Sequence, residues 1–230
     1  RLDPTSDGTA RALNDLAALH FMQGRLDASL DAARRWDALI RRRDGPRSLD
    51  RIGPIGRIVA AHLQTQRLDS ARRWLDAGYA ITRPQQATHP EAHRRLMGLE
   101  GWYFAERGDH AASVRVSREI LALHRRTGAP LADIALAERI LGDVCVQARD
   151  FACADSALAA SQQHYRTVFG PDNRYEGMVT GHLAELAAFR GDRPRAESLF
   201  AAGMRLRERH FGPGSREVAD LRRARDTLLR

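Results

Sequence analysis

The sequence predicts an all-α chain: a solenoid of five antiparallel helical hairpins followed by one further helix at the C-terminal end. The main observation is an internal repeat, because a tight-turn position recurs at intervals of 42, 42, 41 and 42 residues, at Gly24, Gln66, Gly108, Arg149 and Gly191. Small and apolar side chains also recur around each turn at helical spacing. Repeats of this length each form one supersecondary unit, and stacked copies make a solenoid.

Small residues occupy two positions of every repeat. Seven residues before the turn stand Ala17, Val59, Gly101, Gly142 and Ala184. Five residues after it stand Ser29, Ala71, Ser113, Ala154 and Ala196. Two helices of one hairpin approach closely only where side chains are small, so these positions mark the predicted crossing point.

Larger residues occupy two other positions and are expected to fill the layer between hairpins. Eight residues before the turn stand Leu16, Ile58, Glu100, Leu141 and Leu183. Nine residues after it stand Ala33, Leu75, Ser117, Leu158 and Phe200. Glu100 breaks the apolar pattern, which predicts that the third repeat is the least regular.

The repeats are expected at about 9–45, 48–84, 90–128, 131–170 and 174–212, with the end helix at 215–229. Gly45 and Pro46 end the first repeat, and the first helix of the second repeat is expected to start at Pro54, since proline is favoured in a first turn. Pro84 should stop the second repeat. Thr88 or His89 should cap the next helix, with Pro90 in its first turn. One continuous array over residues 1–230 is predicted, because a solenoid has no single central core.

Certain stretches carry a family resemblance: Leu13–Ala17 (LNDLA), His182–Leu186 (HLAEL), and the linkers Phe169–Asp172 (FGPD) and Phe211–Gly214 (FGPG), 42 residues apart. With the small-large rhythm around each turn, they resemble the tetratricopeptide repeat in its long variant, found in kinesin light chains and many bacterial regulatory proteins. The resemblance implies a right-handed superhelix whose first helices line an inner groove that binds a partner segment.

Carried over position by position, the resemblance implies a peptide-binding groove formed by Arg11, Asn14, Asp15, Arg57, Gln64, Arg95, Trp102, Arg139, Asp143, Gln147, His182, Glu185 and Phe189. The partner expected is a protein or peptide segment with acidic groups beside an apolar anchor, since arginine forks suit carboxylates. The lysine-asparagine clamp of chaperone-binding members is absent, which argues against an Hsp70 or Hsp90 tail as the ligand.

The resulting hypothesis is a non-catalytic protein-binding scaffold. The alternative is a sensory or regulatory module of a bacterial Ser/Thr kinase or transcriptional regulator. No catalytic motif is found, and no cofactor or metal is expected: His89 and His93 lie four apart, but no third ligand is placed. Arg41, Arg83, Arg125 and Arg166 recur in the last turns of second helices, where cations stabilise helix ends.

Composition bears on the partners and the compartment that the sequence predicts. The net charge is +8, every basic residue is arginine, and the alanine content fits a high-GC bacterial genome, so arginine count is weak evidence for nucleic-acid binding. The chain begins with Arg1 and is expected to be a piece of a longer protein, with no membrane span of its own. Cys145 and Cys153 are expected to be reduced thiols in the bacterial cytoplasm. A disulfide and a periplasmic location are the alternative.

Overall fold

The computed structural model describes residues 6–230, and the regular structure of these residues is entirely helical. The chain folds as two compact units, residues 1–116 and 117–230, and one helix, α6 (His110–Arg126), runs across the division. In residues 6–230 no helix is both long and apolar enough to cross a membrane.

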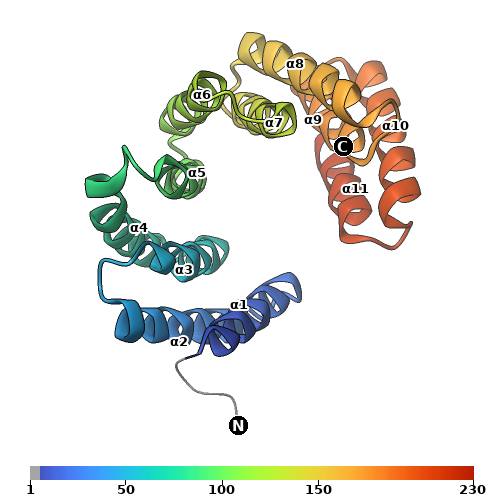
Figure 1. Ribbon diagram of the computed structural model, residues 1–230. Helices are drawn as coiled ribbons and strands as arrows, with labels where there is room; N and C mark the ends of the chain where they lie inside the picture. Colours follow the sequence, from blue (N-terminus) through green and yellow to red (C-terminus); the bar gives the residue numbers. More distant parts are fainter. Residues whose placement is uncertain (1–5) are drawn as a thin grey trace. The chain divides into compact units, whose positions relative to one another are not determined.

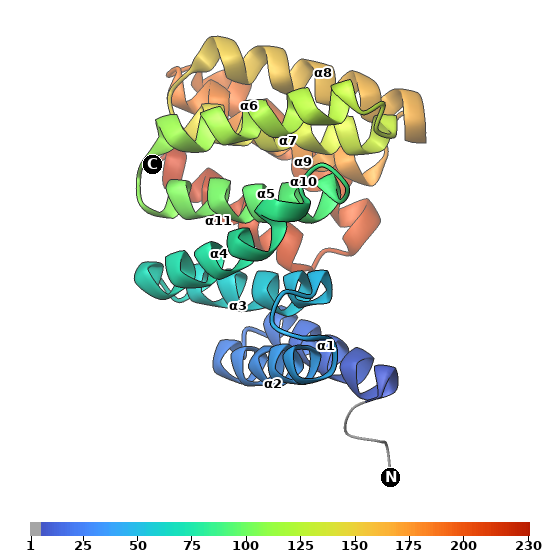
Figure 2. The ribbon, with the colours of Figure 1, turned by 60° about the vertical axis from the view of Figure 1, so that its left-hand side comes forward.

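The first unit stacks helical hairpins in chain order (Figures 1 and 2). Its helices are α1 (Asp7–Met22), α2 (Leu26–Asp44), α3 (Ile52–Gln64), α4 (Leu68–Thr82) and α5 (Pro90–Glu106). A core of Ile55, Val59, Leu75, Tyr79 and Leu96 joins α3, α4 and α5. The hairpin α1/α2 packs onto α3 through a second cluster of small and branched residues.

The second unit contains α7 (Leu131–Gln147), α8 (Phe151–Phe169), α9 (Arg174–Phe189), α10 (Arg193–Phe211) and α11 (Arg216–Leu228). Helices α7 and α8 form one hairpin, α9 and α10 form the next, and α11 packs beside them as the expected end helix (Figure 1). Buried Ala184, Ala196, Phe200 and Leu221 form the core that α9, α10 and α11 share.

The five turn positions share one backbone conformation, which confirms the repeat alignment. Their φ angles are all positive: 71° at Gly24, 56° at Gln66, 75° at Gly108, 59° at Arg149 and 79° at Gly191. After each turn residue, the next N–H donates to a carbonyl five residues back, as at Arg25 to His20 (2.9 Å) and Asp192 to Ala187 (3.0 Å). This bond satisfies a carbonyl that a helix end would leave unpaired.

The small residues meet at the crossing points as predicted. Ala17, Val59, Ala71, Ala154, Ala184 and Ala196 are all fully buried. In the fourth hairpin, a Cβ added at Gly142 would lie 2.5 Å from Leu158 Cδ2, so only glycine fits there. The larger position nine residues after the turn is also buried in every repeat, from Ala33 to Phe200.

The prediction that Leu16 fills a layer between hairpins is wrong. Its equivalents Ile58 and Leu141 are buried, whereas Leu16 is 39% exposed. Within residues 6–230, no hairpin packs against that side of α1. Glu100, which breaks the apolar pattern in the third repeat, is paired: Arg72 Nη1 (2.8 Å) and the Tyr79 hydroxyl (2.7 Å) donate to its carboxylate.

The start of the second repeat also differs from the prediction. Helix α3 begins at Ile52, two residues before Pro54, and a 3₁₀ turn at Leu49–Arg51 precedes it. Ser48 caps that turn, and buried Arg51 binds Asp37 of α2 at 2.9 Å. The ion pair between Arg51 and Asp37 holds the backbone in place here. The positions of the prolines in the sequence do not predict it. At α5, Pro90 is in the first turn as expected, but the capping residue His89 makes no side-chain capping bond.

Arg41, Arg125 and Arg166 lie in the last turns of α2, α6 and α8, as expected, and Arg83 is the C-cap residue of α4. Three of these arginines contact different groups, so they do not form a uniform basic stripe. Arg125 Nη2 donates to Oε1 of fully buried Glu138 at 2.8 Å. Arg166 Nε donates to Glu176 at 2.6 Å, and the Arg83 guanidinium lies 5.3 Å from the Tyr79 ring centroid. Two of these arginines therefore link a second helix to the first helix of the next hairpin.

Candidate functional site

The predicted groove residues come from the first helices of the hairpins, α1, α3 and α5 in the first unit and α7 and α9 in the second. In the first unit, three of them lie together in what we call the α1–α5 hollow. It has a volume of about 550 Å³ and is lined by Asp7, Ala10, Arg11, Asn14, Trp36, Ile40, Arg43, Asp50 and Arg95.

Two guanidinium groups in the α1–α5 hollow are available to a ligand. Within residues 6–230, Arg11 and Arg95 make no hydrogen bond or ion pair, and both are exposed. Arg43, by contrast, pairs with Asp7 and Asp44. The hollow therefore offers two unpaired guanidinium groups, while of its two aspartates Asp7 is engaged by Arg43.

Trp36 and Ile40 supply the apolar part of the α1–α5 hollow. Both belong to α2 and pack on the cluster of Ala10, Leu13 and Leu39. The indole also lies against Gly53, where an added Cβ would come within 2.7 Å of Trp36 Cη2. Trp36 therefore packs between helices and also lines the hollow. Its position beside Arg11 depends on how α1 lies on α2, which no local motif reveals.

The other predicted residues of the first unit are placed differently. The Arg57 guanidinium lies over Phe21, 5.9 Å from the ring centroid, and Gln64 is exposed. Asn14 Nδ2 donates to Asp15 Oδ1 at 3.2 Å. Trp102 is half-buried against the core of α3, α4 and α5, and its Nε1–H donates to Glu106 at 2.7 Å. Trp102 is thus largely a packing residue rather than a free anchor in the groove.

In the second unit, four predicted residues form one cluster between α7 and α9. His182 Nδ1 lies 3.5 Å from Asp143 Oδ1 and 3.8 Å from Glu185 Oε2. On its other side, Arg139 Nη1 lies 3.3 Å from His182 Nε2. Burial opposes a charge on His182 and so does Arg139, but the carboxylates of Asp143 and Glu185 outweigh them and raise the pKa of His182.

The same trio has the spacing of a metal ligand set, since ligand atoms of Asp143, His182 and Glu185 lie within 4.8 Å of one another. Arg139 argues against that use. A guanidinium only donates, so Nε2 of a neutral His182 accepts and Nδ1 carries the proton. Nδ1–H then points towards the carboxylates and has no lone pair for a cation. The contacts of His182 with Asp143, Glu185 and Arg139 join α7 to α9.

The remaining predicted residues of the second unit lie nearby in sequence. Gln147 is exposed, and Phe189 lies under the Arg149 guanidinium, 3.7 Å from its ring centroid. Two residues were missed: Leu136 is 41% exposed and Ile140 is 42% exposed on α7. In other hairpins, the repeat position of Leu136 is occupied by the predicted groove residues Arg11 and Arg95. The repeat position of Ile140 is occupied by Arg57 and His182. That equivalence could have identified them.

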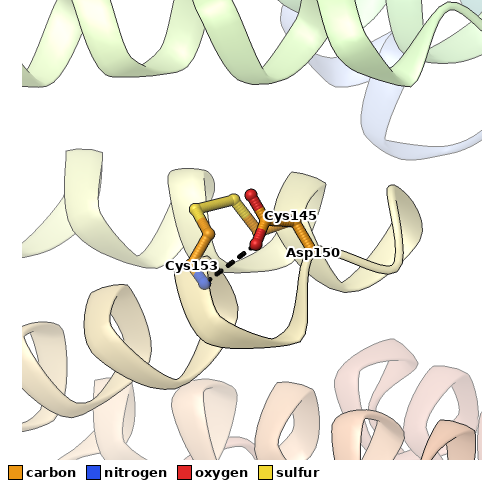
Figure 3. Close-up of side chains that lie close together, drawn as sticks. All are labelled: Cys145, Asp150 and Cys153. Atoms are coloured by element: carbon orange, nitrogen blue, oxygen red, sulfur yellow. Dashed lines mark hydrogen bonds between the residues drawn. A yellow bond between two sulfur atoms is a disulfide. The ribbon is translucent and has the colours of Figure 1, made fainter.

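The prediction of two reduced thiols is wrong, because Cys145 and Cys153 form a disulfide with their Cα atoms 5.8 Å apart. It joins α7 to α8 across the fourth turn (Figure 3). Asp150 caps α8 there by accepting the Cys153 N–H at 3.1 Å, and it also binds Arg118 of α6 at 3.1 Å. The two cysteines occupy facing positions on the two helices of the hairpin, which brings their sulfur atoms together. The eight-residue spacing alone does not predict whether the bond forms.

Comparison with known proteins agrees with this architecture. Residues 9–35 and 179–217 match the tetratricopeptide repeat family. A putative kinesin light chain with nearly identical TPR-like repeats from Podosopora anserina superposes with a TM-score of 0.68 at 13% identity, over 92% of this chain and 99% of that one. BtubC (BKLC) from P. vanneervenii gives 0.64 at 15% identity, over 95% and 86%.

A third solved structure, pilF from Pseudomonas aeruginosa, gives a TM-score of 0.58 at 16% identity, over 97% of this chain and 88% of that one. No curated protein matches the sequence. At these identities the solved structures are evidence for the fold alone. They agree with the matched segments and with the shared turn geometry. The chain therefore has the fold of the tetratricopeptide-type helical hairpins found in the kinesin-light-chain-like repeat proteins.

Proposed function

We propose that the chain is a non-catalytic protein-binding scaffold, and that the first helices of its hairpins bind an extended or helical segment of a partner protein. Arrays of this fold generally serve as interaction scaffolds. The observation that carries the proposal is the α1–α5 hollow, in which Arg11 and Arg95 have no hydrogen-bond or ion-pair partner among residues 6–230. Unpaired guanidinium groups beside an indole are suited to a ligand and contribute little to the fold.

The chemistry of the hollow specifies an acidic group next to an apolar side chain. Guanidinium forks bind carboxylates through charge-assisted hydrogen bonds. Trp36 and Ile40 offer the apolar surface on which a buried anchor contributes most of the binding energy. On α7 of the second unit, exposed Leu136 and Ile140 alternate with Arg139 and Asp143, so that surface is apolar and of mixed charge. A uniformly acidic segment would be disfavoured there.

A pull-down from the native cell with the intact array as bait supplies the partner for the test. The variant Arg11→Glu with Arg95→Glu reverses both unpaired charges of the hollow, and we expect it to lose the captured partner. Arg34→Glu with Arg115→Glu is the matched control, because these arginines are also exposed and unpaired among residues 6–230 but do not line the hollow. If both double variants bind like the parent, the hollow is not the binding site.

Trp102 is less suitable for this test than the arginines. Its indole packs on the core of α3, α4 and α5 and donates to Glu106, so Trp102→Ala removes packing as well as surface. We expect that variant to melt at a lower temperature, and a binding defect in it would not distinguish a contact residue from a destabilised unit.

A second candidate is a sensory or regulatory module of a bacterial Ser/Thr kinase or transcriptional regulator. The disulfide favours a module whose helical array lies outside the cytoplasm, since disulfides persist in oxidising compartments. Cell fractionation followed by thiol counting tests the compartment. The coding sequence upstream tests the module, because kinase motifs followed by an apolar span would support it and their absence would remove it.

A further inference from the structure

Three side chains with metal-ligand atoms gather at the fourth turn, in the second unit. The sulfur atoms of Cys145 and Cys153 and a carboxylate oxygen of Asp150 all lie within 4.8 Å of one another (Figure 3). In the structure the two sulfur atoms are bonded to each other. Reduction of that bond leaves two thiols and a carboxylate side by side at one end of the hairpin of α7 and α8.

The backbone holds these three residues in place without help from the disulfide. The Asp150 N–H donates to the Cys145 carbonyl at 3.0 Å, and the Cys153 N–H donates to Asp150 Oδ1 at 3.1 Å. Within the same hairpin, the close contact of Gly142 with Leu158 sets the distance between α7 and α8. Reduction removes none of these contacts, so we expect the two thiols to stay at facing positions.

The donor types and their spacing suit one tetrahedral cation of the Zn²⁺ class. Zn–S bonds are about 2.3 Å long and Zn–O bonds about 2.0–2.2 Å, so two ligand atoms of one ion lie at most about 4.6 Å apart. Side-chain rotation at the three residues covers that range. Thiolate ligands select Zn²⁺ and softer cations over Mg²⁺ and Ca²⁺. Two sulfurs and one carboxylate oxygen leave the fourth position of a tetrahedron to water.

Asp150 is oriented for this use and is reachable from solvent. Its Oδ2 accepts a hydrogen bond of 3.1 Å from Arg118 Nη2, and partners of this kind hold a ligand in place. Each carboxylate oxygen has two lone pairs, so it can bind an ion while it accepts one hydrogen bond. The Asp150 side chain is 43% exposed and Cys153 is half-buried, so a cation can reach fully buried Cys145 from the turn.

We propose that Cys145, Cys153 and Asp150 bind a thiophilic divalent cation, Zn²⁺ or one of its class, when the disulfide is reduced. A thiol reductant opens the bond: two reductant thiols become one disulfide, and each cysteine sulfur gains a hydrogen. The cation then bonds to both sulfurs and to Asp150, and the two thiol protons leave to water. The bound ion links α7 to α8 where the disulfide did, so the fourth hairpin keeps a cross-link in either redox state. This site does not depend on the proposed binding function.

Titration of the intact chain with Zn²⁺ tests the proposal. The parent is reduced with a phosphine, freed of reductant without oxygen, and titrated in a calorimeter beside the oxidised parent. We expect one Zn²⁺ per reduced chain and binding at least about 100-fold weaker to the oxidised chain, since the metal ligand is the thiolate. With Co²⁺ as the probe, a sulfur-to-metal charge-transfer band should appear only after reduction. Equal binding to the two forms would overturn the proposal.

Three variants, each reduced like the parent, separate ligand roles from folding. Cys153→Ser should lose the cobalt band and the Zn²⁺ binding. Asp150→Asn keeps a side chain that caps α8 but removes the charge, and it should weaken Zn²⁺ binding by about 10-fold or more. His182→Gln changes the other residue group with metal-ligand spacing and should bind Zn²⁺ like the reduced parent.

Melting curves recorded with a chelator present show whether each of these variants is folded. Binding that is lost in His182→Gln and kept in Cys153→Ser would place the cation elsewhere and overturn the proposal. Parent-like affinity in folded Asp150→Asn would remove the carboxylate from the site and overturn it as well.

Discussion

The hydroxyl of Ser113 donates a hydrogen bond of 2.9 Å to the carbonyl oxygen of Gly101 on the facing helix of its hairpin. Two repeats earlier, Ser29 donates the same bond to Ala17 at 2.8 Å. The backbone of one helix thus lies within hydrogen-bond reach of a one-carbon side chain on the other. This distance shows why the position five residues after each turn is small in all repeats.

Enlarging that position should therefore destabilise a hairpin. Ala196 is the equivalent residue of the fifth hairpin and is fully buried. We expect Ala196→Leu to lower the free energy of unfolding by roughly 1–3 kcal/mol through overpacking. Chemical denaturation measures it, with Ala219→Leu on the exposed side of α11 as the size-matched control. Equal midpoints for the two variants would contradict the crossing geometry.

Two glycines should respond oppositely to alanine. Gly191 has a φ of 79° and open space around it, so Gly191→Ala meets only the backbone cost of the left-handed conformation, about 1 kcal/mol. Gly98 lies within α5 in equally open space, and Gly98→Ala should stabilise by roughly 0.5–1 kcal/mol because alanine favours the helix. Melting curves of the two variants should shift in opposite directions. Shifts of the same sign would contradict this assignment.

The disulfide predicts the outcome of thiol chemistry. Labelling the unfolded chain without reductant should detect no free thiol, since both cysteines are bridged. Reduction should lower the free energy of unfolding by roughly 2–3 kcal/mol, the loop-closure effect expected for a sequence separation of 8 residues. Cys145→Ala with Cys153→Ala serves as the control, because its stability should not change with reductant. Two labelled thiols in the untreated parent would contradict the bridge.

Stability should depend on pH through His62, a nearly fully buried histidine of α3. Burial, assisted by the positive charges of Arg34, Arg67 and Arg73, lowers its pKa from the ordinary value of 6.5. Below that value the unfolded chain takes up a proton that the folded chain does not, so folding loses stability as the pH falls. The parent should lose stability below about pH 6.5 more steeply than His62→Leu. Parallel stability profiles for the two proteins would exclude this contribution.

His182 should contribute with the opposite sign. Its pKa is raised by Asp143 and Glu185, so its contribution is fully present below the ordinary histidine pKa and is lost as the pH rises through the raised value. The stability difference between the parent and His182→Gln should therefore shrink as the pH rises through neutrality. Urea titrations at several pH values measure it, and a difference that grows over the same range would show that the carboxylates do not control His182.

The turn and crossing positions could be read from the sequence because each depends on one local requirement. Gln66 and Arg149 adopt the left-handed conformation that glycine adopts at Gly24, although neither residue favours it. Only their repeat spacing identified them. Helix α7 begins at residue 131, where the fourth repeat was predicted to begin.

Part of the candidate site was also determined by the sequence. Arg11, Asn14 and Arg95 follow from their repeat positions, and they do line one hollow. Trp36 and Ile40 complete it from α2, a second helix, whereas the resemblance placed groove residues on the first helices only. The angle at which two helices cross determines what a half-buried side chain contacts on the neighbouring helix. For this reason Trp36 lines the hollow, whereas Trp102 packs into a core.

Tertiary structure alone decided the contacts between repeats. The exposure of Leu16, the pairing of Arg125 with Glu138 and the bridge between Cys145 and Cys153 each depend on what lies opposite in space. The repeat pattern fixes which side of a helix faces its neighbour, because that side must be apolar or small in every copy. The repeat pattern does not determine the partner of a charged or reactive side chain. A different rotamer or a missing neighbour changes that partner without changing the pattern.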